Sequence, residues 1–420
     1  MALSTTVFTN ISQLVTVATE SGRNTGIAMN NIGVIDNAVM IAGEKVEWIG
    51  TAEEYHTVKD ELHTRFTNYN TLDIGGKCVI PGFVDSHTHV VFAGNRSGEF
   101  ARRLQGVSYQ QIASEGGGIL STMRAVRNAT VDELYETGKA LALSAMRYGT
   151  TSMEIKSGYG LSLDAELNQL RAIKRLKEEL PLRITATFLG AHDFPPEYAD
   201  NRDGYVDTVI NEMLPRVADE QLAVYCDVFC DTGYYTLEQS QRILESAAAL
   251  GLRVKVHADE LSAFGAAGLA ASLGAVSADH LLFVSDTDID ALKEAGTVAA
   301  LLPGTAYTLR LPYAPARRMI ESGATVALAT DCNPGSCFME NMQQVLSLAC
   351  MNMKMSIEEA ITAATLHGAA ALNMNASCGS LTKGYNADFL VLDTPHYADL
   401  VYHFGVNHVE QVWIDGVRRV

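Results

Sequence analysis

The stretch Pro81-Gly-Phe-Val-Asp-Ser-His-Thr-His-Val90 decides how the rest of the chain is interpreted. It begins apolar and runs into a His-x-His pair, His87 and His89. In a strand, alternate side chains point to the same face, so both imidazoles are expected to project together from one strand end. Two convergent neutral imidazoles form half of a site for zinc or a similar divalent ion. The pair by itself also fits two surface histidines, so the interpretation depends on further ligands at later strand ends.

Composition excludes several classes of protein. The chain has 420 residues, of which 47% are hydrophobic and 19% charged, as in an ordinary soluble enzyme. A net charge of −18 argues against nucleic-acid and anionic-membrane partners. No secretory signal and no bilayer-length apolar run is expected, and seven cysteines, an odd count, do not suggest a disulfide framework. The expected location is the cytoplasm, with reduced thiols.

Strand-like and helix-like segments alternate from residue 79 to residue 372. Nearly continuous apolar strands that alternate with helices predict a parallel sheet covered on both faces, and eight such units predict a (β/α)8 TIM-like barrel. A doubly wound open sheet is the alternative, but the chain has no Gly-x-Gly-x-x-Gly turn. The eight predicted strands are 79–90, 150–156, 182–191, 223–230, 252–258, 275–282, 297–302 and 324–330.

Both ends of the chain have β character. Residues 37–50 carry two β-rich runs joined through Gly43, which predicts a hairpin. β-rich runs return after residue 379. We therefore predict a small composite β-sandwich domain from residues 1–78 and 373–420, flanking a metal-dependent hydrolase barrel over residues 79–372.

Further metal-binding residue types stand at later strand ends. His257 ends the fifth predicted strand, His280 the sixth, and Asp331 follows the eighth. Active sites of these barrels lie at the C-terminal ends of the strands, so these side chains should meet His87 and His89 on one rim. A single histidine at a strand end is usually structural, whereas this joint pattern predicts a metal site.

Several stretches resemble the amidohydrolase superfamily. The three that carry this resemblance are Pro81-Gly-Phe-Val-Asp-Ser-His-Thr-His89, Val256-His-Ala-Asp-Glu260 and Ala329-Thr-Asp-Cys-Asn-Pro-Gly335. Within the superfamily these stretches resemble the branch that opens the imidazolone ring in histidine degradation. The match also takes in Phe92-Ala-Gly-Asn-Arg-Ser-Gly-Glu-Phe100, Glu154-Ile-Lys-Ser-Gly-Tyr-Gly-Leu161, Ala191-His-Asp-Phe-Pro-Pro-Glu197 and Ser277-Ala-Asp-His280. The His-x-His pair is shared by the whole superfamily, whereas Lys156-Ser-Gly-Tyr-Gly160 and Thr330-Asp-Cys-Asn-Pro-Gly335 are more specific to this branch. The resemblance implies a barrel with a composite β domain, a homodimer, and cytosolic hydrolysis of 4-imidazolone-5-propanoate to N-formimidoyl-L-glutamate.

The resemblance also implies a ligand set. Many relatives hold two metals through a carboxylated Lys on strand four, but residues 225–230 contain no Lys, and Lys156 on strand two is expected to pair or to shape the rim. One divalent or trivalent ion per chain, zinc or iron, is therefore expected. An ion can lower the pKa of a bound water to about 7. Its expected ligands are His87, His89, His257 and Asp331.

Roles for the remaining residues follow from the same resemblance. His280 with Asp331 is expected to activate water, with a fifth metal ligand as the alternative role of His280. Glu260 is expected to bind a ring N–H and to protonate the leaving nitrogen. Arg96 can pair bidentately with the propionate, although a solvated surface Arg is the usual alternative. Other expected substrate contacts are Tyr109, Tyr159, His192, Asn333, Gly335 and Ser336.

Two other functions compete. A mononuclear deaminase of guanine or cytosine uses the same metal frame, but such bases offer no carboxylate to Arg96 and release ammonia. A metal-free barrel used for assembly is a different class, and such barrels have typically lost the ligand histidines that this chain keeps.

Overall fold

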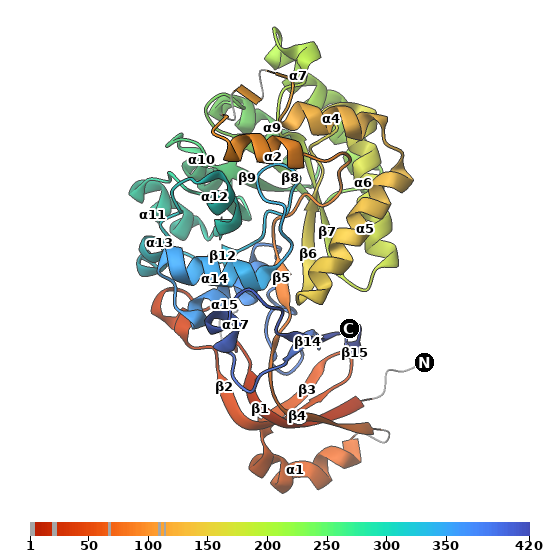
Figure 1. The fold of residues 1–420 in the computed structure, drawn as a ribbon, viewed down its shortest axis with the longest axis vertical. Coiled ribbons are helices and arrows are strands. Elements are labelled where there is room, and N and C mark those ends of the chain that lie inside the picture. Colours follow the sequence, from red (N-terminus) through yellow and green to blue (C-terminus); the bar gives the residue numbers. More distant parts are fainter. Residues whose placement is uncertain (1–4, 19–22, 66–68, 108–110, 113–114) are drawn as a thin grey trace.

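The computed structural model describes residues 5–18, 23–65, 69–107, 111–112 and 115–420. They form two sheets, an eight-stranded parallel sheet ringed by helices and a seven-stranded sheet built from both ends of the chain. Figure 1 shows the helix-covered sheet above the terminal sheet, with both chain ends beside the latter.

The parallel sheet is a nearly closed barrel. Its strand order is β12-β11-β10-β9-β8-β7-β6-β5. The bridge between Thr88 and Cys332 joins the two outer strands, with a hydrogen bond of 2.9 Å from His89 N to Cys332 O. The predicted (β/α)8 barrel is thereby confirmed over the open sheet. The strands are β5 Phe83–Asp85, β6 Thr150–Lys156, β7 Arg183–Ala191, β8 Tyr225–Cys230, β9 Arg253–Ala258, β10 Ser277–His280, β11 Val298–Leu301 and β12 Val326–Leu328.

The first barrel strand is much shorter than predicted. Residues up to Pro81 belong to β4 (Tyr69–Pro81) of the terminal sheet, and the chain changes sheets at Gly82. A Cβ at Gly82 would clash with the Thr151 side chain, so this crossing requires glycine. His87 and His89 consequently follow the end of β5 and lie outside the strand itself.

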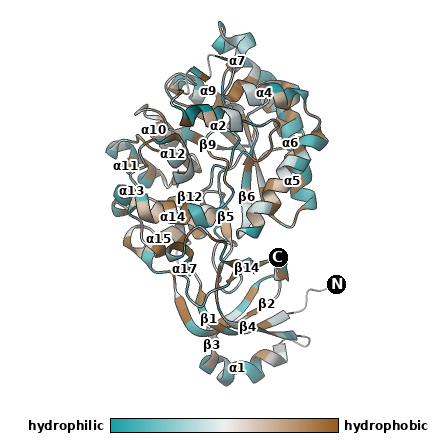
Figure 2. Cartoon of the chain, viewed as in Figure 1, coloured by the Kyte–Doolittle hydropathy of each residue, from teal (hydrophilic) through white to brown (hydrophobic). Residues whose placement is uncertain are grey.

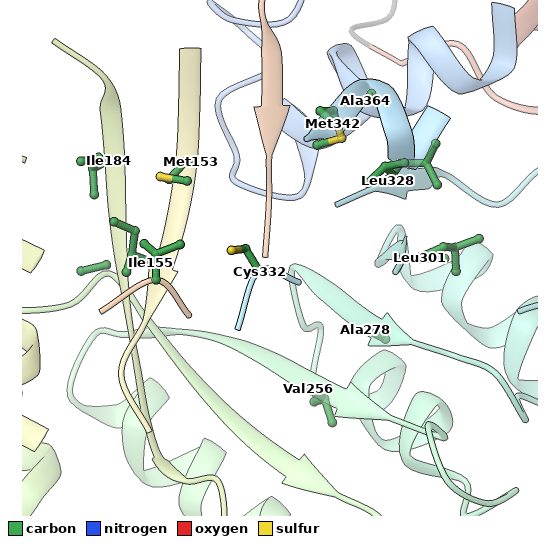
Figure 3. Packing of buried hydrophobic residues seen from close by; sticks show 14 of the residues in the cluster. Met153, Ile155, Ile184, Val256, Ala278, Leu301, Leu328, Cys332, Met342 and Ala364 are labelled. Carbon is green, nitrogen blue, oxygen red and sulfur yellow. The ribbon is translucent and has the colours of Figure 1, made fainter. Parts of the chain in front are cut away.

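Helices cover the barrel. Ser and Thr capping boxes start α5, α9 and α15, satisfying backbone N–H groups at the helix ends. Figure 2 shows hydrophilic residues along the outer helices, and Figure 3 shows Leu328 of β12 near Met342 of α14 and Ala364 of α15. The helices are α2 Ser97–Leu104, α4 Ile119–Asn128, α5 Val131–Arg147, α6 Leu163–Glu179, α7 Arg202–Thr208, α8 Leu214–Asp219, α9 Leu237–Ala249, α10 Ala266–Ser272, α11 Asp286–Ala295, α12 Pro303–Leu309, α13 Ala316–Ser322, α14 Met342–Met353, α15 Ile357–Ala364 and α16 Leu366–Ala370.

The terminal sheet has the order β15-β14-β13-β4-β1-β2-β3. It curls around its own core, in which Phe8 contacts Phe389 and Trp413 edge-on at 5.1 and 5.0 Å between ring centroids. The predicted hairpin is β2 with β3. The division at residues 78 and 373 stays a prediction. The elements are β1 Thr5–Val15, β2 Val34–Ala42, β3 Val46–Thr51, α1 Ala52–Arg65, β4, β13 Phe389–Leu392, α17 Asp399–Tyr402, β14 Val409–Ile414 and β15 Val417–Arg418.

None of the helices among the described residues combines the length and the apolar character needed to span a bilayer. All seven cysteines are free thiols, and six of them are buried.

Candidate active site

A cavity of about 850 Å³ opens at the C-terminal ends of the barrel strands. His87 is fully buried just beneath it, and Tyr109 lies outside the described residues. Helix α2 lies on the side of the barrel away from the terminal sheet (Figure 1) and contributes Phe100 to the lining. The predicted residues that line the cavity are His89, Arg96, Tyr159, His192, His257, Glu260, His280, Asp331, Asn333, Gly335 and Ser336.

Two histidines and one aspartate converge on a common point. The Nε2 atoms of His87 and His89 lie 3.2 Å apart, and Asp331 Oδ1 lies 3.5 Å from the first and 3.6 Å from the second. His87, His257 and His280 form a second group whose ligand atoms lie within 4.8 Å of one another. His87 is therefore shared by both groups, and the strand ends bring all five predicted residues together.

The electrostatics of this cluster suit a metal ion. Burial holds the pKa values of His87, His89 and His280 well below the usual histidine range, so these rings are neutral at pH 7 and their lone pairs are available. Burial raises the pKa of Asp331 to about 6, against a hydrogen bond from Thr305 that lowers it. Three neutral imidazoles beside one carboxylate form a donor set for a divalent ion, so the residues present fit a metal.

Two further carboxylates lie behind the histidines. His87 Nδ1 donates to Asp279 Oδ2 at 2.7 Å. His257 Nδ1 lies 3.0 Å from Asp227 Oδ2, within ion-pair distance but without the alignment of a hydrogen bond. A carboxylate at Nδ1 fixes the tautomer that leaves Nε2 to a metal, as in many metal sites.

Thr305 at the start of α12 holds the second oxygen of Asp331. Its hydroxyl donates to Asp331 Oδ2 at 2.5 Å, and both residues are buried. We expect Thr305→Val, which keeps the shape of the side chain, to lower the free energy of unfolding by about 1–3 kcal/mol, because a buried carboxylate oxygen loses its donor. Denaturant unfolding of the chelator-treated protein measures the change. Thr305→Ser keeps the hydroxyl and is the control; an equal loss in both variants would assign the effect to packing.

Arg96 lies against the loop after β12. Its Nε donates to Glu99 Oε2 at 2.9 Å, and the same carboxylate accepts from Gly118 N. A Cβ at Gly335 would clash with Arg96 Nη1, so any larger residue there would displace the Arg96 guanidinium. Arg103 Nη2 donates to Gly335 O at 3.0 Å. Arg96 and Arg103 thus bring two guanidinium groups to this wall of the cavity, the first of them paired with Glu99.

His192 and Tyr159 form the opposite wall. His192 Nδ1 donates to Gly158 O at 2.9 Å, and burial lowers the pKa of His192 to about 3, so the ring is neutral. Gly158 has φ +112°, and a Cβ there would lie 2.9 Å from Leu189 O. The buried carboxylate of Glu166 accepts hydrogen bonds from Gly158 N at 3.0 Å and from two following backbone N–H groups, which fixes this turn.

Glu260 faces His280, with 3.6 Å between Oε2 and Nε2. Burial first, and then the nearby Asp331 and Asp231, hold the pKa of Glu260 well above the usual glutamate range. The raised pKa favours the protonated form of Glu260, whereas the neutral His280 ring can accept a proton. Asp231 anchors this loop by accepting from Leu261 N at 2.8 Å.

The side chain of Asn333 stabilises the loop in which it lies. Its Oδ1 accepts from Gly335 N and Ser336 N, each at 2.8 Å, and its Nδ2 donates to Asp331 O at 2.7 Å. Asn333 thereby presents Gly335 and Ser336 to the cavity.

Lys156 lies in the barrel interior, where its side chain is fully buried, and it pairs with Asp227. The expectation that Lys156 forms an ion pair is confirmed. Its side chain does not shape the rim, because it is fully buried inside the barrel.

Several residues in and beneath the site were not predicted from the sequence. Asp227, Lys255 and Asp279 are charged side chains inside otherwise apolar strands, and that contrast is the signal that could have found them. Thr305 and Glu166 carry no comparable signal, because Thr and Glu near helix starts are common.

Comparison with known proteins places the chain in a family. The model of the amidohydrolase family matches residues 78–419. A protein of Desulfotalea psychrophila named imidazolonepropionase is 54% identical over 345 residues, which is 82% of this chain and 83% of the relative. A protein of Parabacteroides distasonis with the same name is 46% identical over 408 residues, or 97% of each chain.

Solved structures share the fold at much lower identity. The guanine deaminase of E. coli has a TM-score of 0.71 at 16% identity and covers 99% of both chains. An adenosine deaminase of Xanthomonas campestris with bound zinc has a TM-score of 0.66 at 18% identity and covers 99% of this chain and 92% of its own. At these identities the likeness concerns the fold alone. With a family match over most of its length and relatives of this name aligned nearly end to end, the chain belongs to the amidohydrolase family and, within it, to the imidazolonepropionases.

Proposed function

We propose that the protein hydrolyses 4-imidazolone-5-propanoate to N-formimidoyl-L-glutamate in histidine degradation. Water adds to the ring amide carbonyl, the C–N bond opens, and the leaving nitrogen takes a proton. The observation that carries the proposal is the presence, in one cavity, of a histidine–aspartate cluster and the Arg96 guanidinium. The first suits metal-assisted attack on an amide, and the second suits the carboxylate of the substrate.

We propose that one ion per chain, zinc or iron, is held by His87, His89, His257 and Asp331. Bound there, such an ion lowers the pKa of water to about 7 and supplies a nucleophile at neutral pH. His87, Glu154 and Asp279 form another group whose ligand atoms lie within 4.8 Å of one another. Lysine ammonium groups already lie 2.6 Å and 3.1 Å from Glu154 Oε2, which disfavours a second cation there.

Proton transfer is assigned to the two groups whose pKa values are shifted in opposite directions. His280, neutral and facing the cluster, takes the proton of the attacking water together with Asp331. Glu260, whose raised pKa favours the protonated form, binds a ring N–H and returns a proton to the leaving nitrogen. Two groups whose pKa values are shifted in opposite directions are suited to act as base and acid.

The substrate is held by the two walls of the cavity. Arg96 pairs with the propionate, helped by the hydroxyl groups of Tyr159 and Tyr109. His192 contacts the substrate ring through Nε2, which accepts a hydrogen bond because Nδ1 donates to Gly158 O. Gly335 and Ser336, presented by Asn333, contact the substrate from the loop after β12.

Incubation with freshly made 4-imidazolone-5-propanoate tests the function. Loss of its ultraviolet absorbance, with N-formimidoyl-L-glutamate as the product, is expected. A mononuclear deaminase would instead turn over guanine or cytosine and release ammonia. Ammonia release from such a base, without turnover of the imidazolone, would favour the deaminase.

Arg96→Ala is expected to reduce kcat/KM by the equivalent of about 2–5 kcal/mol, because the propionate loses its buried partner. Metal content should stay intact, since Arg96 is not one of the proposed ligands. Arg96→Lys is the matched variant; it keeps the charge but not the planar fork, and should recover only part of the loss. Steady-state kinetics with metal analysis measures both. An Arg96→Ala enzyme within threefold of the parent would place the propionate elsewhere.

We further propose a cytoplasmic homodimer that acts on a small molecule, without nucleic-acid or membrane partners. The net charge of −18 supports the last two statements. Sedimentation equilibrium tests the oligomeric state.

A further inference from the structure

Five charged side chains lie inside the barrel beneath the histidine cluster. Each is at most 1% exposed, and they come from strands β6, β8, β9 and β10. None has a role in the water activation or substrate binding proposed above. They are Glu154, Lys156, Asp227, Lys255 and Asp279.

Lys156 is the centre of this network. Its Nζ lies 2.7 Å from Asp227 Oδ2, 3.1 Å from Glu154 Oε2 and 3.5 Å from Asp279 Oδ2. Lys255 Nζ is 2.6 Å from the same oxygen of Glu154 but 4.0 Å from Asp279 Oδ2, and it donates to Ser86 O at 3.1 Å. Glu154 thus links the two lysines, and only Lys156 contacts both aspartates among the residues that the structure describes.

Those two aspartates are the carboxylates behind the ligand histidines. Asp279 accepts from His87 Nδ1, and Asp227 lies beside His257 Nδ1. The backbone adds a further link, because Lys156 N donates at 2.9 Å to the carbonyl of Thr88, which stands between His87 and His89. A single ammonium group therefore contacts the supports of two histidines, one just past the end of β5 and one on β9.

Stability alone does not account for such a network. Removing five ionisable groups from water is costly, and replacing a buried ion pair by apolar side chains of similar volume is often neutral or stabilising. What apolar side chains cannot do is hold two carboxylates against two imidazole Nδ1 atoms.

We propose that Lys156 is a positioning residue of the metal centre, which fixes Asp279 and Asp227 so that His87 and His257 direct Nε2 toward the ion. The inference rests on the proposed metal centre but not on the proposed substrate. Partners of this kind typically change metal affinity or activity 10- to 100-fold when they are lost.

Zinc release tests the inference. The zinc-loaded parent and Lys156→Met are mixed with an excess of chelator, well below the melting temperature of either, and the rate of zinc loss is followed. Lys156→Met is expected to release zinc about 10- to 100-fold faster. Its kcat should fall while KM changes little, because no substrate contact is removed.

Lys255→Met is the matched control, since it removes an equally buried ammonium group from the same network. Lys255 forms no ion pair with Asp227 within the described part of the chain, so zinc release should stay within threefold of the parent. A purely structural network would instead lower the melting temperature in both variants and leave both release rates alike.

Release from Lys156→Met within threefold of the parent, or equal release from both Met variants, would overturn the inference. If Lys156→Met does not fold, Asp279→Asn tests the same link with an isosteric change, and its expected zinc loss is at least tenfold faster. Release at the parent rate would then count against the inference. A parent protein that holds no zinc or iron would overturn the metal centre itself.

Discussion

Metal and turnover are expected to disappear together when Asp331 or His257 is replaced by Ala. Asp331 Oδ1 lies near the Nε2 atoms of His87 and His89, and His257 belongs to a second group of possible ligand atoms that shares His87. Each replacement would therefore remove one of the proposed ligands. The loss should exceed the 10- to 100-fold effect typical of residues behind the ligands. Elemental analysis of the purified variants, with kinetics on the same samples, measures both quantities.

His367→Ala is the control for this pair of variants. His367 is a fully buried histidine of α16 whose Nδ1 donates to Val326 O at 2.8 Å, away from the cluster. It should keep its metal although it also loses a buried imidazole. Retention of metal by Asp331→Ala or His257→Ala, or two tightly bound equivalents per parent chain, would contradict the proposed ligand set.

His280→Ala is expected to keep its metal and to lose turnover by about 10²–10⁴-fold, the usual contribution of a positioned base. Neutral His280 faces both the cluster and Glu260, whose carboxyl is the proposed acid. Glu260→Gln should lose less, because an amide can still orient the ring. Single-turnover kinetics on metal-matched samples measures the chemical step. Loss of metal from His280→Ala would make His280 a fifth ligand and assign the proton to another group.

The barrel and most of its rim could be predicted from the sequence. Apolar strands alternating with helices indicate a covered parallel sheet, and the ends of such strands meet on one side. This reasoning brought together residues as distant in the chain as His87 and Asp331, whose side chains lie 3.5 Å apart in the structure.

The inside of the barrel could not be predicted in the same way. A strand buried on both faces has no polar side to mark its orientation, so the sequence leaves open whether Lys156 pairs or shapes the rim; its side chain is buried in the interior and pairs there with Asp227. The role of Thr305 also depends on tertiary structure, because α12 brings it to Asp331 from 26 residues away. The early end of the first barrel strand depends on the packing of Gly82 against Thr151.

Metal reconstitution tests the central claim most directly. Chelator-treated protein receives increasing zinc or iron, and loss of the ultraviolet absorbance of 4-imidazolone-5-propanoate is recorded at each step. We predict that activity rises linearly and reaches its plateau at one equivalent per chain, with N-formimidoyl-L-glutamate as the product. Full activity without metal, a plateau only at two equivalents, or no hydrolysis at any metal concentration would contradict the account.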